Sequence, residues 1–212
     1  MIIEDLKLMG YRQAWERQEH AHSSVVEGGE ERLLLVEHPS VITFGRRAEA
    51  AAKNLVASAE MLRKMGVEVV ESDRGGDITF HGPGQLVIYP IVRLNEHRLS
   101  VGGYVRKLEE VMISVLSDLG VKAMKDEAIG VWVEEKKICA LGVRIKRGVS
   151  LHGVALNVTT DLRYFDLIVP CGLTGKGVTS LKELLKEKTP AMEKVKRVVV
   201  ERMTAAFAGV GS

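Results

Sequence analysis

The stretch Lys137-Ile-Cys-Ala-Leu-Gly-Val-Arg-Ile-Lys-Arg-Gly-Val-Ser-Leu-His-Gly-Val-Ala-Leu-Asn-Val158 decides the fold class. It holds two apolar runs, at 137–145 and 149–158, on either side of a polar Lys-Arg-Gly break. Apolar runs joined by a short turn that contains glycine are typical of a β-hairpin. We therefore predict two antiparallel strands here.

Working outward, the remaining apolar runs predict further strands and helices in mixed order. Strands are expected at 2–7, 33–37, 41–44, 67–70, 78–80, 85–94, 121–124 and 130–133. Helices are expected at 11–22 and 58–65, from the N-cap Ser100 to Gly120, after the capping box Ser180 with Glu183, and from Thr189-Pro190 to about 208. This order predicts an α+β fold with a largely antiparallel mixed sheet and flanking helices.

Length and composition narrow the class of protein. The chain has 212 residues, 46% of them hydrophobic and 27% charged, which suits one soluble domain over 1–212. A net charge of +2 makes no general case for nucleic acid or a membrane as partner. Two cysteines are too few for a secreted disulfide framework, and the N-terminus does not resemble a signal peptide. We therefore expect a cytoplasmic location.

One cysteine lies in a setting that can present a thiol to a pocket. In Asp166-Leu-Ile-Val-Pro-Cys-Gly-Leu-Thr-Gly-Lys-Gly-Val-Thr-Ser-Leu181, an apolar run leads to Pro170, and Cys171 precedes Gly172. The proline favours an extended residue before it, and the glycine permits a sharp turn after it. Cys171 is thus a candidate nucleophile, although a free cysteine can equally be a buried structural thiol.

A second unusual stretch is rich in glycine. Asp73-Arg-Gly-Gly-Asp-Ile-Thr-Phe-His-Gly-Pro-Gly-Gln85 holds four glycines in thirteen positions. Such a backbone can approach a ligand closely, but a pair of tight turns at a sheet edge is the alternative. The stretch matches neither a Walker A loop nor a dinucleotide-binding GxGxxG loop.

Lys137 opens the first strand of the hairpin. Strand alternation predicts that Lys137 shares a face with Cys139 and Leu141, while Lys136 points to the other face. A lysine here is either the solvated end of a hairpin or a functional cation.

Four motifs together resemble the octanoyltransferases, the lipoyl(octanoyl) transferases of lipoate biosynthesis. They are the segments 74–85, 137–143 and 151–158, and 166–172 together with 175–181; Leu-Leu-Leu-Val-Glu-His-Pro with Gly-Arg-Arg, within 33–47, also fits. The resemblance covers about residues 5–185 and implies an α+β fold shared with lipoate and biotin protein ligases. Cys139 stands where the family is expected to have alanine.

The resemblance implies an acyltransferase that carries out the first step of endogenous protein lipoylation. Octanoyl would pass from octanoyl-acyl carrier protein to a lysine of apo lipoyl domains, in 2-oxo acid dehydrogenase complexes and the glycine cleavage H protein. The acyl-thioester nucleophile falls on Cys171 and the activating lysine on Lys137, with no metal or other cofactor. The substrate-binding residues fall on Arg74, Gly75, Gly76, Asp77, Ile78, Thr79, Phe80, His81, Ala140, Leu141, Gly142, Gly153, Val154 and Ala155.

The chemistry of thioester exchange agrees with these assignments. The donor is already a thioester, so ATP is not needed, but a cysteine is only a few per cent thiolate near pH 7. Lys137 on an apolar strand is expected to have a lowered pKa and to take the thiol proton. The backbone of Leu141 or Gly142 is the candidate oxyanion hole. His81 is expected to orient Lys137 or the incoming amine.

Three alternatives stay open from the sequence. An ATP-dependent lipoate or biotin protein ligase would share the fold and would not need Cys171. A non-catalytic module that binds acyl carriers would leave Cys171 incidental. A metal site built from Cys139, Cys171 and a histidine lacks closely spaced ligand pairs.

Overall fold

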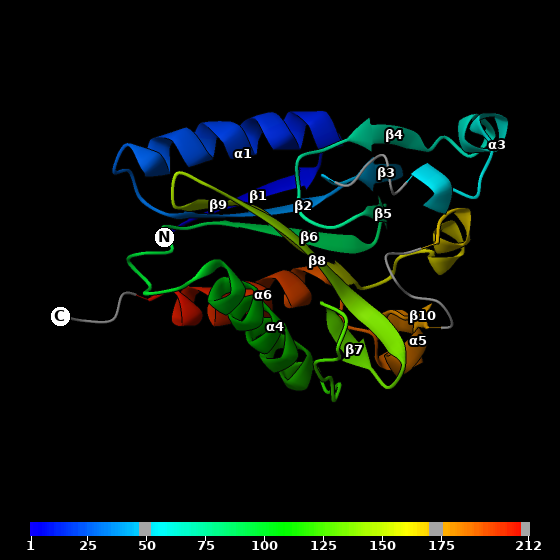
Figure 1. Cartoon of the computed structure of the whole chain (residues 1–212). Helices are drawn as coiled ribbons and strands as arrows, with labels where there is room; N and C mark the ends of the chain where they lie inside the picture. The colour runs from blue at the N-terminus through cyan, green and yellow to red at the C-terminus, as the bar shows by residue number, and fades with distance from the viewer. Residues whose placement is uncertain (47–51, 170–175, 209–212) are drawn as a thin grey trace.

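The computed structural model describes residues 1–46, 52–169 and 176–208 (Figure 1). The strands are β1 (Ile2–Leu8), β2 (Arg32–Glu37), β3 (Val41–Phe44), β4 (Glu68–Glu71), β5 (Ile78–His81), β6 (Gln85–Ile91), β7 (Val131–Val133), β8 (Lys136–Lys146), β9 (Val149–Asn157) and β10 (Gly177–Val178). The α-helices are α1 (Tyr11–Val26), α3 (Ala59–Lys64), α4 (Val101–Asp118), α5 (Leu181–Leu185) and α6 (Met192–Ala206). Short 3-10 turns are η1 (Ala52–Asn54), η2 (Leu162–Leu167) and η3 (Lys186–Lys188).

The main sheet has seven strands in the order β1-β2-β6-β9-β8-β10, and β7 pairs with β8. The pairs β2–β6, β6–β9, β8–β9 and β7–β8 are antiparallel, whereas β1–β2 and β8–β10 are parallel. The predicted α+β class and largely antiparallel sheet are confirmed. The predicted hairpin is the β8–β9 pair, whose register runs from Cys139 opposite Leu156 to Lys146 opposite Val149.

Both faces of the sheet are covered, so its central strands are apolar throughout. On β2, Leu34 and Val36 pack in the cluster that contains α1, while Leu33 and Leu35 pack in the larger cluster that contains α4 and α6. Figure 1 shows α1 on one side of the sheet and α4 and α6 on the other. Burial on both faces explains the continuous apolar runs of β2 and β6.

A smaller sheet, ordered β4-β3-β5, lies beside the main one. β3 is parallel to β4 and antiparallel to β5. The glycine-rich stretch 73–85 begins just after β4, which ends at Glu71, and it contains β5 (Ile78–His81). Gly45 N donates to Asp77 O at 2.6 Å and Arg46 N donates to Arg74 O at 3.0 Å, which fixes the intervening loop against β3.

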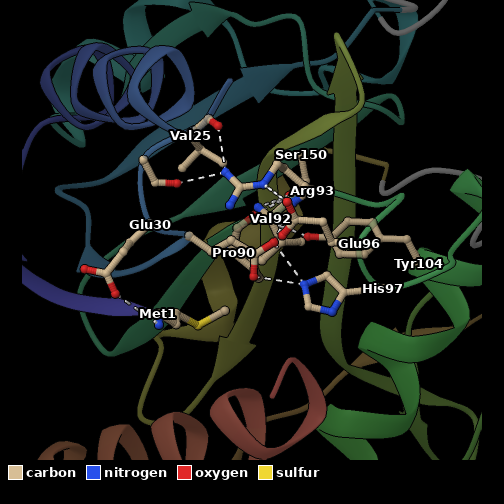
Figure 2. A network of polar contacts seen from close by, with 12 residues as sticks. Met1, Val25, Glu30, Pro90, Val92, Arg93, Glu96, His97, Tyr104 and Ser150 are labelled. Atoms are coloured by element: carbon tan, nitrogen blue, oxygen red, sulfur yellow. Dashed lines mark hydrogen bonds and ion pairs between the residues drawn. The ribbon is translucent and has the colours of Figure 1, made fainter. Parts of the chain in front are cut away.

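Pro90, in the central strand β6, lacks a main-chain N–H, and side chains complete the hydrogen bonding around it. Ser150 Oγ donates to Pro90 O at 2.7 Å and accepts from Val92 N at 2.9 Å, and Tyr104 OH also donates to Pro90 O. Nearby, the Arg93 guanidinium bonds the carbonyl oxygens of Val25 and Gly29 (Figure 2). This network ties the end of β6 to α1, α4 and the start of β9.

The pairing of β7 with β8 contains an irregularity that sequence alternation does not predict. Val131 lies opposite Cys139 and Trp132 lies opposite Lys137, so Ile138 is an extra residue in β8. Consecutive residues Val131 and Trp132 point to opposite faces, and so do their partners. The predicted shared face of Lys137 and Cys139 is therefore wrong: Ile138 and Cys139 both enter the main apolar core.

Other differences from the expected elements are local. The segment 121–124 does not form a strand, because Val121 N returns to Leu116 O at the helix end and only Met124 bridges to Trp132. The last helix begins at Met192 with Ala191 as its N-cap, so Pro190 lies before the first turn. The helix α1 extends to Val26. Among the described residues, no helix combines the length and apolarity that a membrane span requires.

Candidate active site

A cavity of about 560 Å³ lies where the glycine-rich loop meets β6, β8, β9 and the first residue of α1. Its volume is within the range of small-molecule sites. Most of the predicted site residues line it. They are Arg74, Gly75, Gly76, Asp77, Ile78, Thr79, His81, Lys137, Ala140, Leu141, Gly142, Gly153, Val154 and Ala155.

Phe80 is the predicted substrate-binding residue that does not line this cavity. Its ring stacks on Tyr164 with centroids 4.8 Å apart and meets Phe165 edge-on at 5.6 Å. Phe80 is 1% exposed and belongs to the apolar cluster beneath the small sheet. Phe80 therefore packs β5 against the apolar core and does not contact the cavity.

The glycine-rich loop docks onto β8 through a close backbone contact. Gly75 N donates to Val143 O at 3.0 Å. A Cβ on Gly75 would lie 2.7 Å from Val143 O, and a Cβ on Gly142 would lie 2.8 Å from Gly75 O. The absence of side chains at both positions is what brings the loop against β8 and closes this wall of the cavity.

Arg74 braces the loop from inside. Its guanidinium donates to Thr43 O at 2.6 Å, to Asp77 O at 2.9 Å and to Gly75 O at 3.0 Å, and its Nε donates to Thr43 Oγ1 at 3.0 Å. Arg74 is 6% exposed. These bonds hold the loop's shape and place a buried positive charge beside the cavity.

Lys137 lies at the cavity wall next to an indole ring. Its Nζ is 4.8 Å from the centroid of the Trp132 ring, and Lys176 Nζ is 5.0 Å from the same centroid. Lys176 also pairs with Asp126 at 2.6 Å. The aliphatic part of the Lys137 side chain packs on Gly130. A Cβ at Gly130 would lie 2.8 Å from Lys137 Cε. Lys136 is exposed, as alternation predicts.

The last part of the Cys171 motif, residues 177–179, lies beside Lys137. Gly177 pairs with Lys136 and Val178 pairs with Lys137 in the parallel β8–β10 ladder. Thr179 N then donates to Lys137 O at 3.0 Å. Cys171 itself lies outside the described residues. The other cysteine, Cys139, is fully buried, and burial raises its pKa to about 12, which makes it a poor nucleophile.

His81 and His152 line the cavity, His38 packs against His81, and burial favours the neutral form of all three. Burial lowers the pKa of His38 to about 4, although its Nδ1 donates to Met9 O. Burial, then Arg74 and Arg144, lower the pKa of His152 to about 3. His152 Nε2 donates to Asp73 Oδ1 at 2.7 Å, and Arg144 pairs with the same carboxylate. Burial likewise places the pKa of His81 well below its usual value.

The cavity also contains residues that sequence reasoning did not select. They are Tyr11, Val87, Tyr89, Val105, Ala128, Ile129, Val143, His152, Phe165 and Val178. Most are ordinary apolar positions of strands and helices, with no local signal of a role. His152 is the exception, since a histidine within an apolar strand was visible but was equally compatible with a core position. Within the described residues, no group of three or more His, Cys, Asp or Glu is placed to hold a metal ion.

Comparison with known proteins identifies the family. The profile of the lipoyl protein ligase A/B catalytic domain matches residues 10–204. The octanoyltransferase of Bacteroides thetaiotaomicron is 43% identical over 92% of this chain and 90% of its own length. That of Koribacter versatilis is 50% identical over 84% of this chain and 72% of its own length.

Solved structures agree on the fold. Lipoate-protein ligase A bound with ATP superposes with a TM-score of 0.83 at 17% identity, over 98% of this chain and 85% of that one. The biotin protein ligase of Aquifex aeolicus gives a TM-score of 0.54 at 11% identity, over 98% and 69%. At these identities the structures show the shared fold alone. The sequence relatives and the profile together show that this chain is an acyltransferase that belongs to the octanoyltransferase family, within the lipoyl protein ligase A/B catalytic domain.

Proposed function

We propose that this enzyme moves octanoyl from octanoyl-acyl carrier protein to a lysine of apo lipoyl domains, through a thioester on Cys171 with Lys137 as acid and base. The observation that carries the proposal is the position of Lys137. It lies in the cavity wall and pairs with Val178, seven residues after Cys171 in the chain. The acceptors are the lipoyl domains of 2-oxo acid dehydrogenase complexes and the glycine cleavage H protein, and the setting is the cytoplasm.

The cavity suits an acyl chain. Apolar side chains such as Val87, Ile129 and Val154 line it together with the glycine-rich loop. Burying the seven carbons beyond the thioester carbonyl contributes about 5–6 kcal/mol, at ~0.8 kcal/mol for each. One carbon more or less changes this amount only slightly, so sharp selection for octanoyl requires a closed end of the cavity.

Lys137 supplies the proton transfers in both halves of the reaction. Neutral Lys137 takes the Cys171 proton as sulfur attacks the carrier thioester, and it returns the proton to the departing carrier thiol. In the second half, it takes a proton from the lipoyl lysine amine as nitrogen attacks the acyl carbon and the Cys171 sulfur leaves. Its ammonium form favours the thiolate by charge.

The tetrahedral intermediates need N–H donors, and strand geometry favours Leu141 over Gly142. Main-chain groups of successive strand residues point to opposite edges. Val143 O accepts from Gly75 N, so it points away from β9. Leu141, two residues earlier, shares that direction, whereas Gly142 points toward β9. We infer that Leu141 N–H is the candidate oxyanion donor.

Intact-protein mass spectrometry after mixing with octanoyl carrier tests the mechanism. The parent should gain the mass of one octanoyl group, Cys171→Ser should not, and Cys139→Ala should gain it as the parent does. An octanoyl group on Cys139, or none on the parent, would refute the thioester step.

Nucleotide dependence separates this function from the ligase alternative, which would form an acyl-adenylate. Transfer from octanoyl carrier to a lipoyl domain should proceed in buffer free of ATP and magnesium. A strict requirement for both would move the enzyme to the ligase class.

A further inference from the structure

A chain of hydrogen bonds runs from the cavity to the return strand. His81 Nδ1 bonds Gln85 Oε1 at 2.7 Å, Gln85 Nε2 donates to Asn157 Oδ1 at 2.9 Å, and Asn157 Nδ2 donates to Thr179 O at 3.0 Å. Each of these four residues is at most 5% exposed. Water therefore does not compete for these bonds, and their geometry is imposed by the fold.

Two backbone carbonyls, Thr179 O and Phe80 O, set the direction of every hydrogen bond in this series, because a carbonyl oxygen can only accept. Thr179 O faces the nitrogen of the Asn157 amide, so the amide oxygen faces Gln85. Gln85 Nε2 also donates to Phe80 O at 3.2 Å. The Gln85 oxygen must then face His81, and its only possible partner there is a protonated Nδ1.

The consequence is a defined form of the His81 ring. A neutral imidazole with its proton on Nδ1 carries a lone pair on Nε2. Within the described residues, no group bonds Nε2, and His81 lines the cavity. The surroundings oppose a second proton, because burial, the largest cause, and the Arg74 guanidinium both lower the pKa of His81. The Tyr11 ring stacks on the imidazole with centroids 5.9 Å apart and fixes its plane.

We propose that Gln85 and Asn157 are positioning residues that hold His81 as the Nδ1–H tautomer, so that Nε2 accepts a hydrogen bond from the incoming lysine amine. This inference rests on the proposed function. An amine attacks only through its own lone pair, and an acceptor for one of its N–H groups aims that lone pair at the acyl carbon. The proton released on attack still goes to Lys137.

The same hydrogen bonds couple the histidine to the candidate base. Asn157 holds the carbonyl of Thr179, and the N–H of Thr179 holds the carbonyl of Lys137. One path thus joins the acceptor nitrogen to the main chain of Lys137. Such preorganisation matters because small errors in position are costly in rate.

Nitrogen-15 NMR of the histidine rings in the full-length parent tests the tautomer without any substrate. The signals of His81, assigned by their loss in His81→Gln, should show a protonated Nδ1 and an unprotonated Nε2 at pH 7. A protonated Nε2 with a bare Nδ1 would overturn the proposal. This measurement stands whether or not the enzyme transfers octanoyl.

The second half-reaction tests the consequence. In Gln85→Glu, the carboxylate keeps the bond to Nδ1–H but favours the imidazolium, which turns Nε2 into a donor. Starting from acyl-enzyme freed of carrier, transfer to a lipoyl domain at pH 7 should slow about tenfold or more and recover as pH rises. Acylation of Cys171 should slow much less than this transfer, because the lysine amine takes no part in that half.

Gln13→Glu, on the exposed face of α1, adds the same charge and should leave both half-reactions at parent rates. If Gln85→Glu matches Gln13→Glu in rate and pH profile, the positioning role is wrong. If the parent never forms the acyl-enzyme, the proposed function fails, and the NMR result alone decides the tautomer.

Discussion

The N–H of Thr179 donates to the carbonyl oxygen of Lys137 at 3.0 Å. This bond joins two motifs more than forty residues apart in the chain and extends the parallel pairing of Val178 with Lys137. It places the last part of the Cys171 motif against the strand that carries the candidate base. The catalytic pair of the proposed mechanism depends on that arrangement.

Replacing Lys137 by Met should slow octanoyl transfer by about 100-fold or more, because it removes a base and a cation while keeping an apolar stem. Cys171 should alkylate with a pH profile shifted toward that of an unassisted thiol, near ~8.5. The measurement is the rate of alkylation against pH, with transfer assayed in parallel. Lys136→Met is the matched control, since Lys136 is exposed, and should behave as the parent. Equal profiles in both variants would leave Lys137 with no part in activation.

Adding a methyl group at Gly142 should destabilise the chain and impair transfer together. The new Cβ would lie 2.8 Å from Gly75 O and 3.4 Å from Arg74 Cδ, so the loop must move away from β8. We expect Gly142→Ala to lower the free energy of unfolding by about 1–3 kcal/mol. Gly102→Ala, in α4 with its nearest atom 3.7 Å away, should be neutral or raise it by about 0.5–1 kcal/mol. Urea titration measures the free energy of unfolding of both variants. Equal values would mean that the close contact between Gly142 and Gly75 O does not contribute to stability.

Ser150→Ala should cost about 1–3 kcal/mol of unfolding free energy, because it leaves the buried Val92 N–H without its partner and leaves Pro90 O with Tyr104 OH alone. Ser150 Oγ serves Val92 N and Pro90 O beside the proline of β6 (Figure 2). Ser117→Ala, on the exposed side of α4, should change stability by less than about 0.5 kcal/mol. Thermal or urea unfolding measures the stability of both variants. If Ser150→Ala loses no more stability than Ser117→Ala, the hydrogen bonds of Ser150 do not stabilise this part of the fold.

Stability should fall in mild acid because buried histidines remain neutral in the folded chain. His38 has a folded pKa of about 4, below the unfolded value near 6.5. The contribution of His38 to the free energy of unfolding is complete above about pH 6.5. It is lost as pH falls toward 4, because in that range only the unfolded chain binds the proton. The slope reaches about 1.4 kcal/mol per pH unit for each such group.

The measurement is the free energy of unfolding between pH 7.5 and 5 for the parent, His38→Gln and the exposed His20→Gln. His38→Gln should show a shallower slope than the parent, and His20→Gln should not. Parallel curves for the parent and His38→Gln would show that His38 takes up its proton as readily in the folded chain as in the unfolded one.

Much of this protein was readable from residue order. Apolar runs broken by glycine predicted the β8–β9 hairpin, and the apolar spacing after Ser100 predicted α4, whose N-cap bond from Gly103 N is present. Local patterns suffice for these elements because strand and helix periods act over a few residues. The glycine-rich stretch stood out by composition, with a pair of tight turns as the alternative, and Lys137 was selected through the resemblance to the octanoyltransferases.

Long-range pairing decided the rest. The extra residue Ile138 turns Cys139 into the core and away from the face of Lys137, and no local pattern marks a bulge that exists only through pairing with β7. The orientation of His81 depends on Gln85, Asn157 and the Thr179 carbonyl, which come together only when β5, β6, β9 and β10 pack. A hydrogen-bond chain has a direction only once all its members are in place, so the acceptor nitrogen facing the cavity is a property of the folded chain.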